Sequence, residues 1–123
     1  MKKLYFTFIA IFILQSCSPF EDETITRIKD GSFNDCDSRT IGQLAENFFS
    51  NPEWEAIVAS DGLSYVNLTG GITYDGLAAD ALVQFTAPME DYSDFDINAF
   101  ELNEIPQNAF MIIGLVTAMC ELG

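Results

Sequence analysis

Alternation of apolar and polar residues between two Asp-Gly pairs is the feature that most limits how this chain can fold. The pairs are Asp61-Gly62 and Asp75-Gly76, and Asp-Gly is typical of tight hairpin turns. Between them, one face of a strand carries the apolar side chains of Val66, Leu68, Ile72 and Tyr74. Gly70-Gly71 interrupts the alternation, which indicates a bulge or a bend. The pattern predicts a long strand within an antiparallel sheet.

The segments on either side of this strand supply its neighbours. Residues 54–59 fit either a helical turn or a strand, because their apolar residues recur at both spacings. Residues 79–87 alternate clearly and predict another strand. After a polar loop over residues 88–93 the alternation resumes, and it changes phase near Ala99. That change predicts a bulge in the last strand.

Residues 40–49 predict an amphipathic helix of about three turns. The apolar residues that recur there at helical spacing are Ile41, Leu44, Ala45, Phe48 and Phe49. Asp37 or Ser38 offers an N-cap side chain, and Asn51-Pro52 ends the helical run. This helix therefore precedes the sheet in the chain.

Residues 109–119 are nearly all apolar, which predicts a helix buried against the sheet. Pro106 closes the preceding strand and favours the opening of this helix. Residues 25–31 have no clear period, and we expect them to form a short edge strand or an extended segment.

The order of these elements predicts an α+β fold with two layers. An antiparallel sheet of three or four strands would carry an N-terminal and a C-terminal helix on one face. Residues 31–123 would form this single domain, since so few residues suffice for one hydrophobic core and not for two.

The first residues have the composition of a secretory signal. Lys2 and Lys3 precede an apolar run over residues 4–14, and these 11 residues are too few to cross a bilayer, which needs about 20. Leu14-Gln15-Ser16-Cys17 follows and resembles the lipobox of bacterial lipoproteins. The resemblance implies cleavage of residues 1–16, acylation of Cys17 with chains such as palmitate, and attachment to the outer membrane. Each buried methylene of such chains contributes about 0.8 kcal/mol to membrane binding.

Residues 17–30 would then form a lipidated acidic tether. The cluster Glu21-Asp22-Glu23 resembles the signal that exports some lipoproteins to the cell surface in one Gram-negative lineage. A short charged segment also forms a solvated, disordered linker without any such signal. Display at the periplasmic face and display at the cell surface both remain open.

The same resemblance accounts for the cysteines. With Cys17 acylated, Cys36 and Cys120 remain as an even pair in an oxidising compartment, and we expect them to form a disulfide. A shared metal site is the alternative, but the chain has no histidine and no CxxC motif.

Short motifs of the mature part resemble those of small exported bacterial domains of unknown function. They are Thr40-Ile41-Gly42, Trp54, Val66-Asn67-Leu68-Thr69-Gly70, Val83-Gln84-Phe85 and Phe100-Glu101-Leu102-Asn103. The layout of elements is also similar to that of β-lactamase inhibitor protein and of the small lipoprotein of the outer-membrane assembly machine. Layout alone implies a fold and no activity.

Charge and residue types narrow the function. The whole chain carries a net charge of −14, and without Lys2 and Lys3 the value is −16, which argues against nucleic-acid binding. The chain has no histidine, which removes the usual Ser-His-Asp and Cys-His arrangements, so we expect no enzymatic activity and no cofactor. A carboxylate pair could do acid–base work, but with 19 carboxylates chance proximity is expected.

Two sets of residues remain as candidate binding positions. Asp91, Asp94, Asp96 and Asn98 form the densest group of oxygen ligands and could bind calcium, or could lie on a solvated strand or loop. The calcium-loop pattern fails, because Ala99 stands where its glycine belongs. Trp54 and Tyr65 could anchor a partner or cover the core.

Two function classes follow from these candidates. The first is a membrane-anchored module that binds an envelope or extracellular protein or peptide, and it predicts an open apolar or aromatic surface. The second is a binder of a small ligand or of calcium, and it predicts an enclosed pocket with convergent carboxylates.

Overall fold

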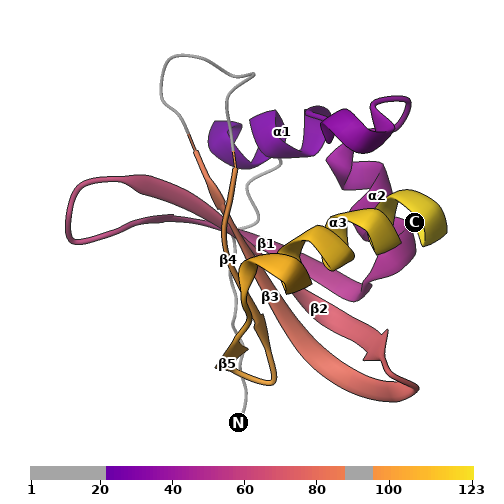
Figure 1. Cartoon of the computed structure of the whole chain (residues 1–123). Helices are drawn as coiled ribbons and strands as arrows, with labels where there is room; N and C mark the ends of the chain where they lie inside the picture. The colour runs from indigo at the N-terminus through magenta and orange to yellow at the C-terminus, as the bar shows by residue number, and fades with distance from the viewer. Residues whose placement is uncertain (1–21, 88–95) are drawn as a thin grey trace, which may run out of the picture.

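Three helices and a five-stranded antiparallel sheet make up the computed structural model, which describes residues 22–87 and 96–123 (Figure 1). The sheet has the strand order β1-β2-β3-β4-β5. In chain order the elements are α1 (Glu23–Asp30), the short 3₁₀ helix η2 (Asn34–Cys36), α2 (Ile41–Phe48), β1 (Ser50–Val58), β2 (Ser64–Tyr74), β3 (Leu77–Thr86), β4 (Ile97–Leu102), β5 (Ile105–Pro106) and α3 (Ala109–Leu122). The α+β class and the antiparallel sheet are confirmed. The sheet has five strands where three or four were predicted, and the predicted N-terminal and C-terminal helices are accompanied by the further helix α1.

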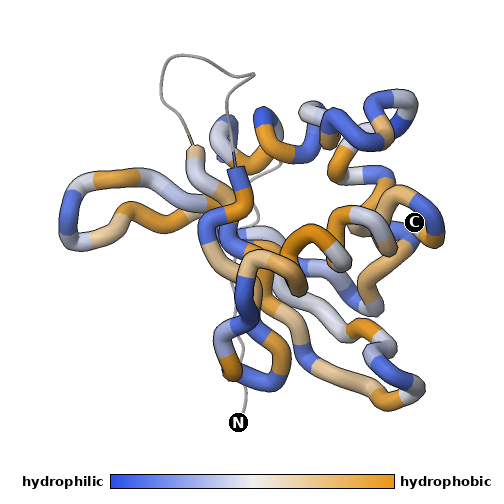
Figure 2. Tube along the Cα trace, viewed as in Figure 1, coloured by the Kyte–Doolittle hydropathy of each residue, from blue (hydrophilic) through white to orange (hydrophobic). Residues whose placement is uncertain are grey.

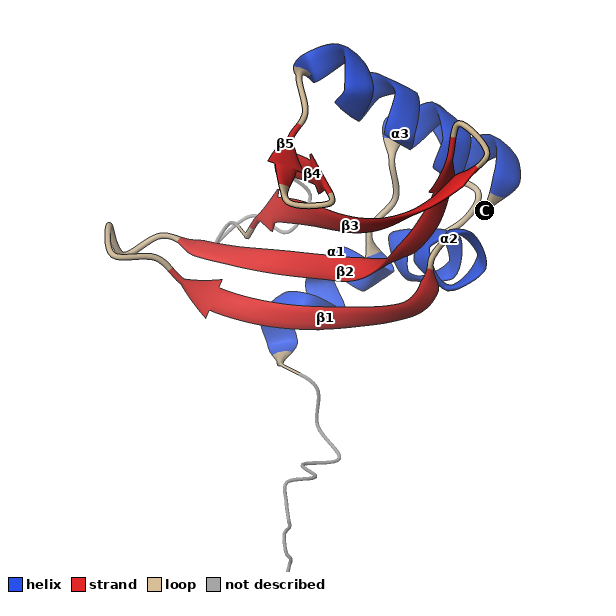
Figure 3. Cartoon of the chain, turned by 90° about the horizontal axis from the view of Figure 1, so that it is seen from below, coloured by secondary structure: helices blue, strands red, loops and turns tan. Residues whose placement is uncertain are grey.

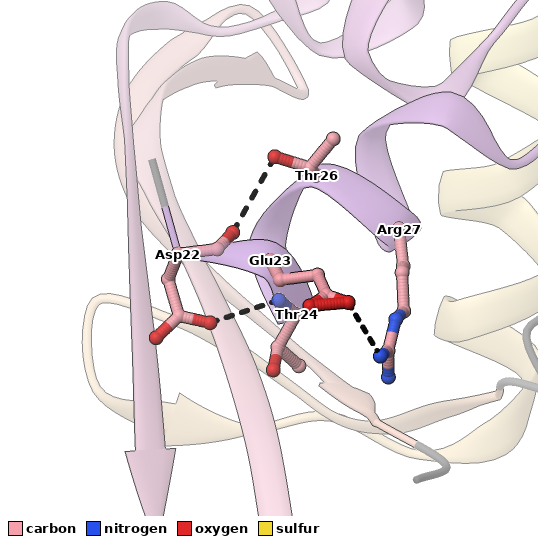
Figure 4. A network of polar contacts seen from close by, with 5 residues as sticks. All are labelled: Asp22, Glu23, Thr24, Thr26 and Arg27. Atoms are coloured by element: carbon pink, nitrogen blue, oxygen red, sulfur yellow. Dashed lines mark hydrogen bonds and ion pairs between the residues drawn. The ribbon is translucent and has the colours of Figure 1, made fainter. Parts of the chain in front are cut away.

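Helix α1 is the first addition to the predicted fold. The Asp22 carboxylate caps its N-terminus by accepting a hydrogen bond from the Thr24 backbone N–H at 2.8 Å (Figure 4). Ile25 and Ile28, one turn apart, are buried in the core. The expectation of a strand or extended chain at residues 25–31 was therefore wrong. Ile25 and Ile28, which fall in the segment 17–30 assigned to the tether from the sequence, pack in the hydrophobic core.

An ion pair between residues one turn apart supports this short helix. The Arg27 guanidinium lies 2.9 Å from the Glu23 carboxylate one turn earlier (Figure 4). Such an i,i+4 pair at the surface contributes about 0.3–0.5 kcal/mol. The cap and the pair stabilise the first turn, and the two isoleucines fix the side that faces the core.

Helix α2 begins at a capping box formed by Thr40 and Gln43. The Thr40 hydroxyl accepts from the Gln43 N–H at 3.1 Å, and the Gln43 side chain accepts from the Thr40 N–H at 2.9 Å. The N-cap is therefore Thr40, and the assignment to Asp37 or Ser38 was wrong. The buried residues Ile41, Leu44 and Ala45 confirm the predicted apolar side of the helix.

Strand β1 resolves the ambiguity of residues 54–59. It pairs with β2 along most of its length, with Trp54 opposite Leu68 and Val58 opposite Ser64. Its register shifts between Ser50 and Glu53, a stretch that includes Pro52. A bulge or bend was predicted at Gly70-Gly71 of β2. Both glycines pair with β3 without interruption. The extra residue of the bulge therefore lies opposite them, in β1.

The Asp-Gly turns confirm the predicted hairpins. Asp75 and Gly76 have φ angles of 53° and 78°, the left-handed conformation that a two-residue hairpin turn requires. Asn103 and Glu104 repeat this geometry with φ angles of 50° and 71°, and their turn joins β4 to β5. Pro106 therefore lies in β5 and does not open the last helix, whose N-cap is Asn108.

The phase change near Ala99 is a bulge, as predicted. Phe85 pairs with Ile97 and Gln84 pairs with Ala99, so that Asn98 is the extra residue of β4. The bulge keeps both Ile97 and Phe100 on the side of the core.

All three helices contribute to one core on a single face of the sheet (Figure 3). Val66, Leu68, Val83 and Phe85 are almost fully buried at the centre of that face. The opposite face has no helix among the described residues. The fold is thus a two-layer sandwich in which one side of the sheet stays open.

We predict that Gly70→Ala destabilises the domain by about 1–3 kcal/mol, because the added methyl would overpack a tight crossing. A Cβ on Gly70 would lie 3.0 Å from the Ser50 carbonyl oxygen and 3.1 Å from the Phe49 Cβ. Gly71→Ala is the matched control, since its Cβ would meet Ser50 Cβ at an ordinary 3.5 Å. Thermal and urea unfolding of the two variants would measure the difference. Equal stability of the two variants would contradict a tight contact between Gly70 and residues 49–50.

Candidate interaction surfaces

A disulfide and an arginine hold helix α3 in place. Cys36 of η2 and Cys120 of α3 are joined with their Cα atoms 5.7 Å apart. The Arg39 guanidinium donates to the Cys120 carbonyl at 2.7 Å and also to the Gly123 carbonyl. These carbonyls are among those that a helix C-terminus leaves without an internal partner, so Arg39 acts as a C-cap. The last turn of α3 is therefore fixed to the segment before α2.

The apolar side chains of α3 are divided between the core and solvent. Leu115 and Met119 are buried, whereas Phe110 is 84% exposed and Ile113 is 62% exposed. Figure 2 shows most of the helix in orange and tan, with paler stretches and a hydrophilic blue stretch near the C-terminus. The prediction of a buried helix is therefore correct for only one side of α3.

We define the α3 patch as Phe110, Ile113 and the half-buried Met111. The Tyr74 hydroxyl, at the end of β2, lies 3.8 Å from the Met111 sulfur and connects the patch to the β2–β3 hairpin. Residues 105–120 contain no charged side chain, and Glu104 and Glu121 flank this run. The patch is thus apolar and neutral in a strongly acidic protein.

Trp54 and Tyr65 lie on opposite faces of the sheet. The Trp54 ring is half-buried on the helix side, where it stacks on Phe85 with ring centroids 6.2 Å apart. The Lys29 ammonium lies 5.4 Å from the Trp54 centroid, a cation–π contact. Tyr65 lies on the open face, between Ile57 of β1 and Thr86 of β3. Trp54 therefore covers the core from the side of β1.

The open face of the sheet is mainly polar. Gln84 at its centre donates to the Asn67 side chain at 3.0 Å and accepts from the Asn98 side chain at 2.8 Å. This ladder runs across β2, β3 and β4. Beside it lies a shallow hollow of about 520 Å³ whose lining includes the carboxylates of Glu53, Asp80, Glu101 and Glu104. Alternating polar residues of this kind are typical of a solvated sheet face.

The structure describes only half of the predicted oxygen-ligand group. Asp91 and Asp94 lie outside the described residues, whereas Asp96 and Asn98 line a hollow of about 590 Å³ next to Ile112 and Val116 of α3. The Asn98 amide nitrogen is engaged with Gln84. Within residues 22–87 and 96–123, no three Asp, Glu or Cys residues lie close enough together to hold a metal ion.

Cys17 likewise lies outside the described residues. In the described part of the chain, no helix combines the length and the apolar composition needed to cross a bilayer. Comparison with protein-family models, with curated proteins and with solved structures finds no significant match for this chain. The surfaces of the described domain are therefore what indicates its function.

The exposed α3 residues could not be located from the sequence. A helix that is apolar all round gives no indication of which side faces solvent. The one available signal was length, because the 14 residues of α3 extend beyond the short helices that pack against it.

We predict that Arg39→Ala lowers the free energy of unfolding by about 1–3 kcal/mol, since two carbonyls lose a charged donor. Arg39→Lys should lose less, because an ammonium still bonds one carbonyl. Ser38→Ala, at the exposed neighbouring position, is the control and should change little. Denaturant unfolding with the disulfide intact would measure these effects. Equal stabilities for Arg39→Ala and Ser38→Ala would rule out the cap.

Proposed function

We propose that this protein is a membrane-anchored cell-envelope lipoprotein that binds another protein through the α3 patch. Cys17 would carry the lipid, and the folded domain would be displayed at the outer membrane, on the periplasmic face or at the cell surface. The module would be non-catalytic, with no cofactor and no nucleic-acid ligand. The observation that carries the proposal is the exposure of Phe110 and Ile113 on adjacent turns of α3.

Exposed aromatic and aliphatic side chains on one helix face are typical of protein-binding surfaces. Burying a side chain such as Phe or Ile contributes about 1.5–3 kcal/mol, so these two would supply part of the free energy of binding a partner. The Cys36–Cys120 disulfide and Arg39 fix the far end of the same helix. A rigid surface loses little conformational entropy on binding.

The structure supports a protein partner better than a small ligand. Among the described residues, the lining of the hollow of about 590 Å³ includes one carboxylate, that of Asp96. The four carboxylates of the open face surround a shallow hollow beside a sheet surface that no described helix covers. The described residues that line these two hollows do not form the enclosed, convergent site that ligand or calcium binding predicts.

Crosslinking in intact cells tests the binding surface. We expect the wild-type protein to yield one stoichiometric envelope protein, and the variant Phe110→Ser/Ile113→Ser to lose it, because both anchors are removed. Folding should be preserved, since neither side chain is in the core. Leu63→Ser is the control, because Leu63 is 57% exposed in the β1–β2 turn, away from α3. Capture that survives in the double variant would refute the role of the patch.

Cys17→Ser tests the anchor separately. We expect this variant, and wild-type cells treated with the lipoprotein signal peptidase inhibitor globomycin, to accumulate the unprocessed precursor with residues 1–16 attached. Immunoblots of membrane fractions would measure both the size and the location of the chain. Normal processing and unchanged outer-membrane fractionation of the variant would show that Cys17 is not the lipidated residue.

A further inference from the structure

Strand β1 lies at the edge of the sheet and has one strand neighbour, β2, among the described residues (Figure 3). The Ala59 N–H donates to the Leu63 carbonyl at 2.9 Å, which places the hydrogen-bonded pairs of β1 and β2 at odd-numbered residues of β1. The backbone N–H and C=O groups of Trp54, Ala56 and Val58 therefore point away from the sheet. Such a row is a template for another strand.

The edge is open over only part of β1. Pro52 has no N–H to donate, and the register shift between Ser50 and Glu53 bends the strand at that end. Both features are typical protections of an edge against pairing. They leave residues 53–58 as the segment that can accept a partner strand.

The two sides of this segment differ in chemistry. Glu53 and Glu55 are exposed and point to the open face, on the same side as Asn67 and Thr69 of β2. Trp54, Ala56 and Val58 point to the helix side, and Val58 is 73% exposed. On the open face an added strand would thus meet the carboxylates of Glu53 and Glu55, followed by Ile57, and on the helix side it would meet only apolar side chains.

A second copy of this chain does not fit the edge. Antiparallel pairing of two β1 strands through their outward-facing groups must match even-numbered residues with even-numbered residues. Two registers keep both glutamates opposite residues of the segment 53–58, and they place Glu53 opposite Glu55 or Glu55 opposite Glu55. One further step leaves Glu53 opposite no residue of β1 and brings the two Glu55 side chains diagonally adjacent. Like charges at these positions destabilise a strand pair, and the net charge of −14 adds long-range repulsion.

We propose that the β1 edge accepts an extended segment of another protein in which basic residues alternate with apolar residues. The basic side chains would pair with Glu53 and Glu55 on the open face, and the apolar ones would extend the row of Trp54, Ala56 and Val58. The positive charge of Lys29, whose ammonium lies over the Trp54 ring, would repel basic side chains on the helix side. The basic residues of the added strand would therefore point to the open face and its apolar residues to the helix side. This strand addition uses a surface distinct from the α3 patch and does not depend on it.

Trp54 provides the measurement, because it is the single tryptophan of the chain and lies within the accepting segment. The probe is a capped peptide, Thr-Val-Lys-Val-Lys-Val-Thr, titrated into the folded domain. We expect a saturable change in Trp54 fluorescence and slower amide hydrogen exchange at Trp54, Ala56 and Val58. The peptide with both lysines replaced by glutamate should bind at least about tenfold more weakly, since two cross-strand attractions become repulsions.

Charge reversal on the protein should invert this preference. Glu53→Lys/Glu55→Lys should lose affinity for the lysine peptide by at least about tenfold and gain affinity for the glutamate peptide. Asp37→Lys/Glu46→Lys is the matched control, with the same change in net charge at exposed positions outside the sheet. Equal losses in the two double variants would mean that only net charge matters and would overturn the proposal.

Backbone pairing is tested on the peptide, so that the protein fold is unaffected. The lysine peptide with N-methyl groups on the amides that face β1 keeps its charge and side chains but cannot donate to the edge. We expect it to lose binding and the exchange protection. Binding of the methylated peptide at unchanged affinity, or no saturable signal with the unmethylated peptide, would refute strand addition.

Discussion

Burial of one face of the sheet against three helices is the constraint on which the rest of the structure depends. Helices α1 and α2 have eight residues each, and helices shorter than about 12–15 residues are marginal in water on their own. Each contributes only two or three buried residues, and these meet the nearly fully buried residues of β2 and β3. Packing against the apolar face of the sheet therefore supplies most of the stability of these two helices.

One-sided burial also explains why the molecule has two surfaces of different character. The three helices pack against the apolar face of β2, β3 and β4. The outer side of α3 and the edge of β1 have no neighbour among the described residues. The α3 patch is neutral and apolar, whereas the edge is bordered by Glu53 and Glu55. Partners of different chemistry would therefore select different sides of the same domain.

The sequence predicts the hairpins and the fold class well, because Asp75-Gly76 permits few backbone conformations and the strand alternation is clear. It misses α1, since Ile25 and Ile28 are the only apolar residues of a short charged segment. It misses β5 because two residues carry no period. It places Tyr65 and Trp54 together as candidates, and only the pairing register separates them onto opposite faces. The exposed face of α3 depends on tertiary packing, which an all-apolar helix does not encode locally.

The disulfide has a mechanical consequence. Cys36 and Cys120 enclose α2 and the entire sheet in one covalent ring, and residues 23–35, which include α1, lie between Asp22 and that ring. Tension applied between the N-terminal side of the domain and the last turn of α3 would pass through the sulfur–sulfur bond. The strands would lie outside the load path, so a pull along this direction would not unzip the sheet.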